Sequence, residues 1–196
     1  MGAATSSTTT VAIGSGAADG SETVRPVAVL VNISILIRAG DYLTPVGREG
    51  LPGMVGYLLA RGGTQSKTAE EMEEKLAFLA ANLNSRVADT QGNVSLNLLA
   101  KDLDEGLALL REVLATPRFQ EDKITLFKQQ SLQGMKRRND ETQDIERREL
   151  GFLALGEGFW ANRHTTAASV ESITRDELQA FHRRWFHPAN LWFWFL

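Results

Sequence analysis

The chain has 196 residues, of which 43 % are hydrophobic, and this is enough to form one ordinary hydrophobic core. The 21 Lys and Arg residues nearly balance the 24 Asp and Glu residues, and the net charge of −3 argues against a nucleic-acid-binding surface or a patch for anionic membranes. The absence of cysteine excludes disulfides, thiol nucleophiles and cysteine metal sites, but it is compatible with cytoplasm and periplasm alike.

The N-terminal segment, 1–26, is rich in Gly, Ala, Ser and Thr, and we expect it to be a disordered low-complexity tail. It lacks the basic start and the apolar run of a signal peptide, and no run in the chain reaches the length of a transmembrane helix. We therefore expect no membrane insertion, and the compartment stays open between cytoplasm and bacterial periplasm. The remaining residues, 27–196, are predicted to form a single domain.

The segment that starts at Val27, VAVLVNISILIRAG, is rich in β-branched residues and predicts a strand buried largely on both faces. A loop follows from Gly40 to Gly50, because this segment contains Pro45 and Gly47.

The stretch GLPGMVGYLLARGGT, residues 50–64, predicts a glycine-capped start, a short apolar helix and a Gly-Gly-Thr stop. Gly53 and Gly56 lie three apart on one side of this helix, where glycine costs about 1 kcal/mol relative to alanine. Such a cost indicates either a close approach of another part of the backbone or a relaxed constraint, and the sequence leaves both alternatives open.

A second helix is predicted in TAEEMEEKLAFLAANL, where Thr68 and Glu71 have the spacing of a capping box. The glutamates of this segment are typical of a solvated face near a helix N-terminus and do not indicate a metal site. The apolar residues of its buried face are Met72, Leu76, Leu79 and Leu83.

A hairpin and a group of helices are predicted next. The segment NSRVADTQGNVSLNLLA is typical of two short strands around a turn at Gly92 and Asn93. The segment DLDEGLALLREVLAT returns to the helical period, and Pro117 ends it. Two further helices are expected at about 120–139 and 142–156. The apolar face of the helix in DLDEGLALLREVLAT consists of Leu103, Leu107, Leu110 and Leu114.

The C-terminal part contains a second capping box, formed by Thr174 and Glu177, then a helix that Pro188 ends, and then the strand NLWFWFL. Strands and helices therefore occur in clusters without a regular βαβ alternation. This order predicts an α+β, two-layer domain in which helices cover one face of a mainly antiparallel sheet. Because residues 191–196 form an apolar edge with no turn after it, we expect the chain to be truncated at its C-terminus.

Few side chains suggest chemistry. His182 and His187 are five apart, a spacing that places them on different helix faces, and His164 lies in a loop. We therefore expect structural or surface histidines and no metal site. The aromatic residues of the terminal strand, Trp192 and Trp194 with the phenylalanine between them, favour core and inter-domain packing over a ligand-binding box.

Two basic clusters, at 136–138 and 147–148, are interspersed with the acidic residues Glu141, Asp144, Glu146 and Glu149. Alternating charges of this kind predict a helix surface with salt bridges, and no contact with nucleic acid.

The ordered set of segments resembles the insulinase/pitrilysin family of zinc metallopeptidases, which includes the mitochondrial processing peptidases. RAGDYLTPVGREGLPGMVGYLLARGGTQSKTAEEMEEKLAFLAANLNSRV is similar to the first conserved block of that family. SVESITRDELQAFHRRWFHPANLWFWFL is similar to a later block. The resemblance covers 27–196 and implies a processing-peptidase-like metallohydrolase domain.

Active members of the family carry H-x-x-E-H on the first helix, in which two histidines hold zinc and the glutamate is the general base. The resemblance places Gly53 and Tyr57 at the histidine positions and Gly56 at the position of the base. A distal glutamate completes the zinc site in the family, and Gln133 takes its place here, 76 residues after Tyr57. The resemblance therefore implies that this chain has lost the family's catalytic set.

A register shifted by one residue, anchored on the Gly-Thr end of the helix, offers Met54, Tyr57 and Leu58 instead. Neither register contains a zinc ligand. We therefore expect no catalytic residue, no metal site and no cofactor in this chain, and zinc only in an active partner.

The resemblance implies a non-catalytic homologue, an accessory half of a clamshell peptidase that helps to enclose a peptide substrate. The expected partner is a homologous zinc peptidase domain or subunit, and a homodimer is an alternative. Three further hypotheses stay open: a structural subunit resembling the core proteins of the respiratory chain, an inactive truncated fragment, and a metallopeptidase with an unrecognised site. The sequence identifies neither the substrate nor the partner.

Overall fold

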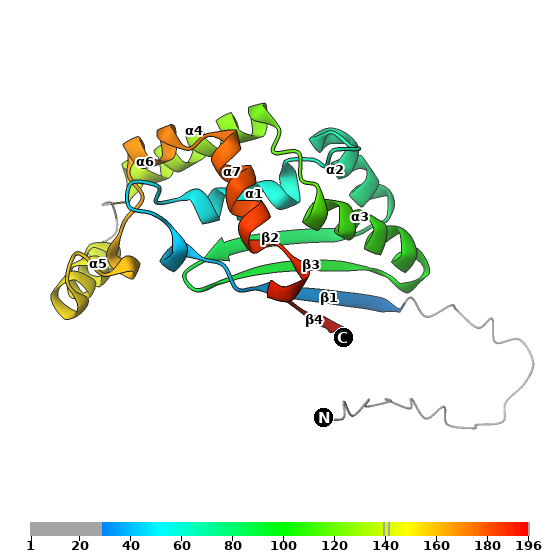
Figure 1. Cartoon of the computed structure of the whole chain (residues 1–196), viewed down its shortest axis with the longest axis horizontal. Coiled ribbons are helices and arrows are strands. Elements are labelled where there is room, and N and C mark those ends of the chain that lie inside the picture. Colours follow the sequence, from blue (N-terminus) through cyan, green and yellow to red (C-terminus); the bar gives the residue numbers. More distant parts are fainter. Residues whose placement is uncertain (1–28, 139, 141, 196) are drawn as a thin grey trace, which may run out of the picture.

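The computed structural model describes residues 29–138, 140 and 142–195, and the predicted tail, 1–26, lies outside them. The described residues form two layers, an antiparallel sheet and a group of helices that cover one of its faces (Figure 1). This arrangement confirms the predicted α+β class. No helix in this part of the chain combines the length and the apolar character needed to cross a membrane.

The sheet has four strands in the order β2-β3-β1-β4, so β2 and β4 form its two edges. All neighbouring strands are antiparallel, and Ile33 lies opposite Leu96 on the central pair. The predicted C-terminal strand is present as the edge strand beside β1. The strands are β1 (Leu30–Ile37), β2 (Asn82–Ala88), β3 (Gln91–Leu99) and β4 (Leu191–Phe195).

Helix α1 occupies the centre of the helical layer, because it packs on β2 and also contacts α4 and α7. Helix α5 projects from one end of the molecule (Figure 1). Helix α6 was not predicted, since it has only six residues. The helices are α1 (Leu51–Arg61), α2 (Ala69–Phe78), α3 (Leu103–Ala115), α4 (Glu121–Arg137), α5 (Thr142–Leu155), α6 (Ala167–Ser172) and α7 (Arg175–Trp185).

Strand β1 is buried on one face only, which corrects the prediction of a strand buried on both faces. Ile33, Ile35 and Ile37 are fully buried against the helices. On the opposite face, Asn32 donates a hydrogen bond to the side chain of Asn97 on β3. The difference arises because helices cover only one side of the sheet in the described part of the chain, and amide side chains satisfy one another on the open side.

The hairpin turn lies at Asp89 and Thr90, not at Gly92 and Asn93 as predicted. Asp89 adopts a φ of 49°, in the left-handed region that aspartate tolerates better than most residues. Gly92 is instead a residue of β3, where the side chain of Val87 lies close to its backbone.

The predicted faces of two helices also need correction. In α2, Met72 and Leu79 are buried as expected, but the helix ends at Phe78 and Leu83 belongs to strand β2. In α3, Leu110 lies within the core, whereas the other three predicted leucines are only half-buried. The buried residues of α3 are Gly106, Leu109, Leu110 and Val113.

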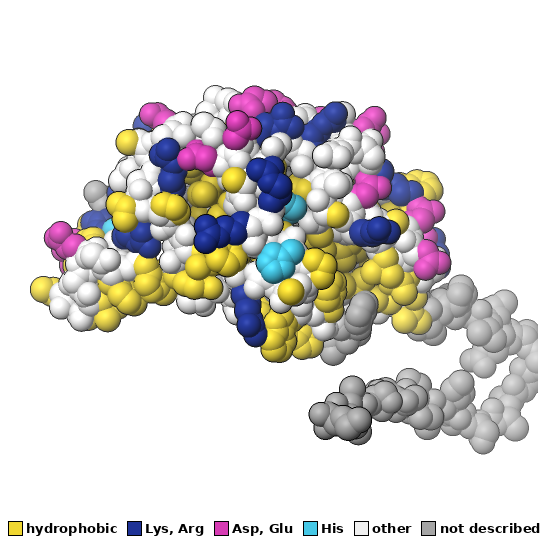
Figure 2. All heavy atoms as spheres, in the orientation of Figure 1, with side chains coloured by type: hydrophobic (Ala, Val, Ile, Leu, Met, Phe, Trp, Pro, Cys, Tyr) yellow, Lys and Arg dark blue, Asp and Glu magenta, His cyan; other side chains and the backbone are white. Residues whose placement is uncertain are grey.

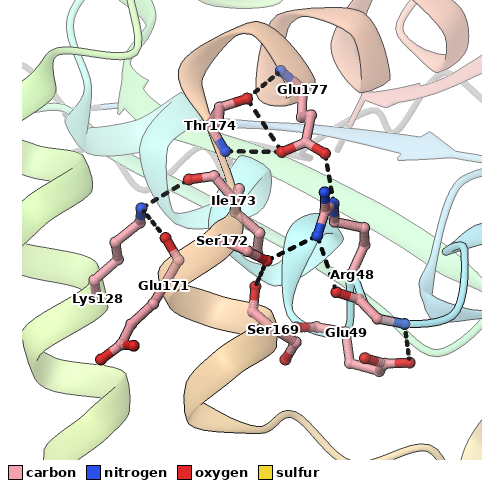
Figure 3. Close-up of polar contacts among 10 residues, drawn as sticks. Arg48, Glu49, Lys128, Ser169, Glu171, Ser172, Ile173, Thr174 and Glu177 are labelled. Atoms are coloured by element: carbon pink, nitrogen blue, oxygen red, sulfur yellow. Dashed lines mark hydrogen bonds and ion pairs between the residues drawn. The ribbon is translucent and has the colours of Figure 1, made fainter.

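Both predicted capping boxes are present, at Thr68 with Glu71 and at Thr174 with Glu177. Glu177 has a second role, because it also accepts a hydrogen bond of 2.5 Å from Nε of Arg48 (Figure 3). The Nη1 atom of Arg48 donates to the hydroxyl of Ser172 at 2.8 Å. Arg48 therefore joins the loop before α1 to the junction of α6 and α7.

Two further contacts fix the same junction (Figure 3). The hydroxyl of Ser169 donates to the carbonyl of Glu49 at 2.9 Å. The ammonium group of Lys128 on α4 donates to the carbonyl oxygens of Glu171 and Ile173 at 3.0 and 2.7 Å. Because these carbonyl groups lie at the C-terminal end of α6, the lysine supplies partners that the short helix lacks.

We expect Glu177→Gln to lower the free energy of unfolding at pH 7 by about 0.5 kcal/mol, the scale of a partly exposed ion pair. Burial alone raises the pKa of Glu177, but hydrogen bonds from Thr174 and Arg48 outweigh it and hold this pKa below its ordinary value of 4.5. A carboxylate with a lowered pKa stabilises the fold above its unfolded-state pKa, and the stabilisation is lost as pH falls through the folded-state pKa.

Urea unfolding at pH 7 and at about pH 3 tests this expectation. The difference between the wild type and Glu177→Gln should shrink at the lower pH, because protonation of Glu177 removes the charge that distinguishes it from glutamine. A difference that is the same at both pH values would contradict it.

Gly56 marks a close approach between helix α1 and the backbone of β2. A Cβ atom at this position would lie 2.5 Å from the backbone nitrogen of Val87 and 3.0 Å from the carbonyl carbon of Arg86. A Cβ atom at Gly53, by contrast, would meet no atom within 4 Å. The sequence left open whether these glycines allow a close backbone approach or reflect a relaxed constraint. The structure shows a close approach at Gly56 and open space at Gly53.

Gly56→Ala should therefore lower the free energy of unfolding by about 2 kcal/mol, since backbone atoms of β2 must move to accept the methyl group. Gly134→Ala in α4 is the matched control, because a Cβ atom there meets nothing within 4 Å. That variant should gain up to about 1 kcal/mol from helix propensity. Equal effects of the two substitutions in denaturant unfolding would rule out the close contact as the cause.

Candidate functional site

A cavity of about 900 Å³ lies where α1, β2 and α4 meet. Helix α1 contributes its outward face, β2 contributes the end of an edge strand, and α4 forms the opposite wall. Residues of these three elements that line the cavity are Gly53, Tyr57 and Arg61, then Ser85, Arg86, Val87 and Ala88, then Phe127, Ser131, Gly134, Met135 and Arg137.

The cavity wall contains an aromatic pair that links two helices. The rings of Tyr57 and Phe127 have centroids 5.0 Å apart, and the guanidinium group of Arg61 lies 4.8 Å from the centroid of the Tyr57 ring. Helix α1 holds this wall in place because Met54 and Leu58, on its other faces, are fully buried. The cavity therefore has an apolar surface beside a positive charge.

The structure brings two of the four predicted site positions together. Gly53 and Tyr57 both line the cavity, one helical turn apart. Gly56 faces β2 instead, and Gln133 is exposed and does not line the cavity, whereas its neighbour Gly134 does. Which positions correspond to the zinc ligands of the family stays a prediction. The shifted register is less suited to a site, since Met54 and Leu58 are fully buried.

The residues around the cavity do not fit a catalytic zinc ion. Such a site needs three protein ligands, and here the helix that faces the cavity presents Gly53 and Tyr57. His164, Asp41 and Asp144 also line the cavity. Among the residues that the structure describes, no three His, Cys, Asp or Glu side chains are grouped so that they could hold a metal ion.

Burial lowers the pKa of His164, and the charges of Arg138 and Arg148 lower it further. Its ring packs edge-on against Phe152 at 5.4 Å, and its Nε2 atom is buried without a hydrogen-bond partner within the described ranges. Burial also raises the pKa of Asp41, although this side chain accepts a hydrogen bond of 2.8 Å from the backbone N–H of Asp89. The cavity therefore holds an imidazole whose pKa is lowered and a partly buried carboxyl group whose pKa is raised.

The remaining two histidines have the structural and surface roles that we predicted. His182 is buried, and its Nε2 atom forms a hydrogen bond of 3.0 Å with the carbonyl of Leu114. Its ring stacks on Phe186 with centroids 4.9 Å apart. His187 is exposed.

Among the described residues, the predicted salt bridges form at one of the two basic clusters. Arg147 pairs with Asp144 at 3.1 Å, and Arg148 pairs with Glu149 at 3.6 Å. In the first cluster, Arg137 and Arg138 line the cavity, and neither forms an ion pair with a described carboxylate. These two arginines line the cavity because the C-terminal end of α4 borders it. Glu141 lies outside the described residues.

The aromatic residues of β4 are not part of the core. Trp192, Phe193 and Trp194 are between 46 % and 53 % exposed, because they lie on an edge strand. Core packing, as predicted, is therefore wrong for these residues, and inter-domain packing stays a prediction. Arg38 lies 4.9 Å from the ring centroid of Trp192. Exposed hydrophobic side chains gather along the lower side of the molecule in Figure 2, around β4 and α5.

Sequence reasoning assigned only Gln133 of α4 to the site and missed the residues of this helix that line the cavity. Phe127, Ser131, Gly134 and Arg138 all line the cavity, and their spacing of four, three and four residues places them on one helix face. This helical spacing is visible in the sequence and could have identified the face. It does not indicate which elements lie opposite, because the face mixes apolar, small and charged side chains.

The model of the insulinase family, peptidase family M16, matches residues 22–154, which is more than half of the chain. The chain belongs to this family. None of the curated proteins is similar enough in sequence to serve as a relative of this M16 domain.

Several solved structures share its fold. An inactive M16 peptidase domain from Pseudomonas fluorescens has a TM-score of 0.76 and 22 % identity, over 85 % of this chain and 40 % of that one. The first half of the periplasmic protease PqqL from Escherichia coli has a TM-score of 0.72 and 15 % identity, over 85 % and 37 % of the two chains.

A third structure is the ferredoxin protease FusC, solved as a mutant in complex with Arabidopsis ferredoxin. It has a TM-score of 0.69 and 14 % identity, over 85 % of this chain and 18 % of that one. The present M16 domain thus spans less than half of the length of each of these three proteins. Its lining residues and its fold fit a non-catalytic member of the family.

We expect Gly53→His, Tyr57→His and Gly134→Glu together to create a zinc site, whereas the wild type should bind no stoichiometric zinc. All three positions line one cavity, and both glycines have room for a side chain. Gly56 is left unchanged, because a side chain there would meet the backbone of β2.

The matched control carries Gln133→Glu in place of Gly134→Glu, so that the third carboxylate lies on the exposed side of α4. We expect this control to bind zinc at least about tenfold more weakly in competition with a chromophoric chelator. Equal affinities of the two folded variants, or zinc in the wild type, would contradict the expectation that Gly53, Tyr57 and Gly134 face one site.

Proposed function

We propose that this M16 domain is the non-catalytic half of a two-part peptidase and that it encloses a peptide substrate together with a homologous, zinc-bearing domain. The observation that carries this proposal is the cavity between α1 and the edge strand β2, whose lining offers no set of metal ligands among the described residues. Such a surface can hold a peptide chain, and the described residues offer no metal site that would polarise its carbonyl.

The edge strand β2 supplies the means of holding an extended chain. It pairs with β3 on one side, and no described strand pairs with its other side. An edge strand of this kind presents unpaired N–H and C=O groups, to which an extended peptide adds as a further strand. Ser85 and Val87 of the same strand border the cavity, so side chains of that peptide would reach Tyr57 and Phe127.

The comparisons support a role beside a partner. The P. fluorescens structure is an inactive domain, and the E. coli structure is one half of a protease. FusC was solved in complex with ferredoxin, a protein ligand. A domain of this fold without metal ligands is therefore suited to complete a substrate-binding chamber whose chemistry belongs to another domain.

The test uses the chain extended to its natural ends and a homologue encoded beside it that carries H-x-x-E-H. Mixing the two should give a stable complex and a higher rate of peptide cleavage than the homologue alone, because the second wall orders an extended substrate. Association is measured by size-exclusion chromatography, and turnover is measured with a fluorogenic peptide.

Two tryptophan variants separate the cavity from the rest of the surface. Gly53→Trp fills the cavity, and Gly158→Trp is its matched control, because a Cβ atom at either position meets nothing within 4 Å and Gly158 does not line the cavity. Gly53→Trp should keep the complex but lose most of the increase in turnover, whereas Gly158→Trp should keep both.

A complex whose turnover is the same with and without this domain would favour a purely structural subunit. A chain that neither binds the homologue nor changes its rate would contradict the proposal altogether.

A further inference from the structure

Four arginines are gathered around the cavity, and they come from three different elements. Arg61 lies at the end of α1, Arg86 lies on β2, and the remaining two lie at the C-terminal end of α4. The four cavity arginines are Arg61, Arg86, Arg137 and Arg138. A protein with a net charge of −3 therefore concentrates positive charge at this concave surface.

None of the four cavity arginines forms an ion pair with a carboxylate among the described residues. The guanidinium group of Arg61 lies against the ring of Tyr57, and Arg138 donates one hydrogen bond of 3.0 Å to the carbonyl of Thr165. Most of their N–H donors are therefore available to a ligand, and guanidinium groups bind carboxylates in a bidentate manner.

The two acidic residues that line the cavity offset only part of this charge, although Asp41 lies near enough to Arg86 for their charges to attract. Asp144 already pairs with Arg147 at 3.1 Å, and Asp41 is partly buried and accepts a hydrogen bond from the backbone of Asp89. The cavity thus keeps an excess of positive charge inside a concave, partly apolar surface. Such a surface concentrates anionic ligands, because its field is screened less than that of an open surface.

We propose that the cavity binds an acidic segment of an extended peptide, with carboxylates held by the four cavity arginines. This inference rests on the proposed function and adds the class of peptide. Alternate residues of a chain paired with β2 lie on one face of the extended sheet. Acidic side chains at alternate positions would therefore lie on one side of that chain, toward the cavity that Arg61 and Arg86 line.

A peptide fits this surface better than a nucleic acid does. A phosphate backbone is continuously negative and would bring charge close to Asp41 and Asp144, whereas a peptide places its carboxylates only where the sequence puts them. Tyr57 and Phe127 pack on each other, so their rings are not a row of separate stacking platforms for bases. The unpaired edge of β2 also offers main-chain groups that only another peptide backbone matches.

The experiment measures binding of three fluorescent peptides to the full chain by fluorescence anisotropy. The peptides have the same length, about twelve residues, and alternate Thr with Glu, with Gln or with Lys. At low salt, the Glu peptide should bind at least about tenfold more tightly than the Gln peptide, and the Lys peptide should bind most weakly. Raising the salt from about 0.05 to 0.5 M should reduce this preference.

Two double variants test whether the cavity arginines cause the preference for the Glu peptide. The double variant Arg61→Gln and Arg86→Gln should bind the Glu and Gln peptides with similar affinity. The control double variant Arg111→Gln and Arg183→Gln removes the same charge from two exposed arginines outside the cavity, and it should keep the tenfold preference. Thermal unfolding of both variants checks that each is folded.

The outcomes separate this inference from the proposed function. If the three peptides bind equally, or if both double variants lose the preference to the same extent, the inference is wrong and the proposed function stands. If no peptide binds in the presence of the zinc-bearing homologue either, the proposed function fails. A single-stranded oligonucleotide that binds more tightly than the Glu peptide and loses affinity in the cavity variant would overturn the inference in favour of nucleic acid.

Discussion

The contact between Gly56 and the backbone of β2 is the constraint on which the rest of this domain depends. With no side chain at this position, helix α1 can lie so close to the sheet that a Cβ atom would come within 2.5 Å of the nitrogen of Val87. This contact fixes the rotation of the helix about its axis. Met54 and Leu58 are then directed into the core, while Gly53 and Tyr57 face the cavity.

The polar network around Arg48 and Glu177 acts on the other side of the same helix. It joins the loop that leads into α1 to the start of α7, and Lys128 on α4 binds the segment between α6 and α7. The helices that form the cavity are therefore held by contacts that lie outside it. We expect cavity residues that face open space, such as Gly53, to change without loss of the fold. This is consistent with a family domain that keeps the architecture and has no metal ligands on this wall among the residues described.

The positive charge of this cavity distinguishes it from a surface that has only lost catalytic residues. An unneeded surface would be expected to acquire the mixture of charges found elsewhere on the chain, where salt bridges join residues such as Arg147 and Asp144 or Lys123 and Glu70. Around the cavity, the arginines of α1, β2 and α4 have no such partners among the described residues. Maintaining like charges at one concave surface costs stability, and a ligand of opposite charge would recover that cost.

The sequence by itself determined the parts of this protein that depend on local chemistry. The capping boxes at Thr68 and Thr174, the helix that starts at Leu51 and the two-layer α+β class follow from hydrogen-bonding side chains and from the period of apolar residues, which act within a few positions of the chain. The resemblance to the insulinase family likewise rested on an ordered set of local segments.

Only the tertiary structure decided what depends on distant neighbours. The two glycines of α1 are equivalent in the sequence, yet Gly56 meets β2 and Gly53 faces the cavity. The arginines of α4 resembled a salt-bridged surface until the fold placed them opposite those of α1 and β2. Burial on one face of β1 depended on the layers around it. Close contact, burial and the field in a cavity are set by elements that are remote in sequence, and no local pattern records them.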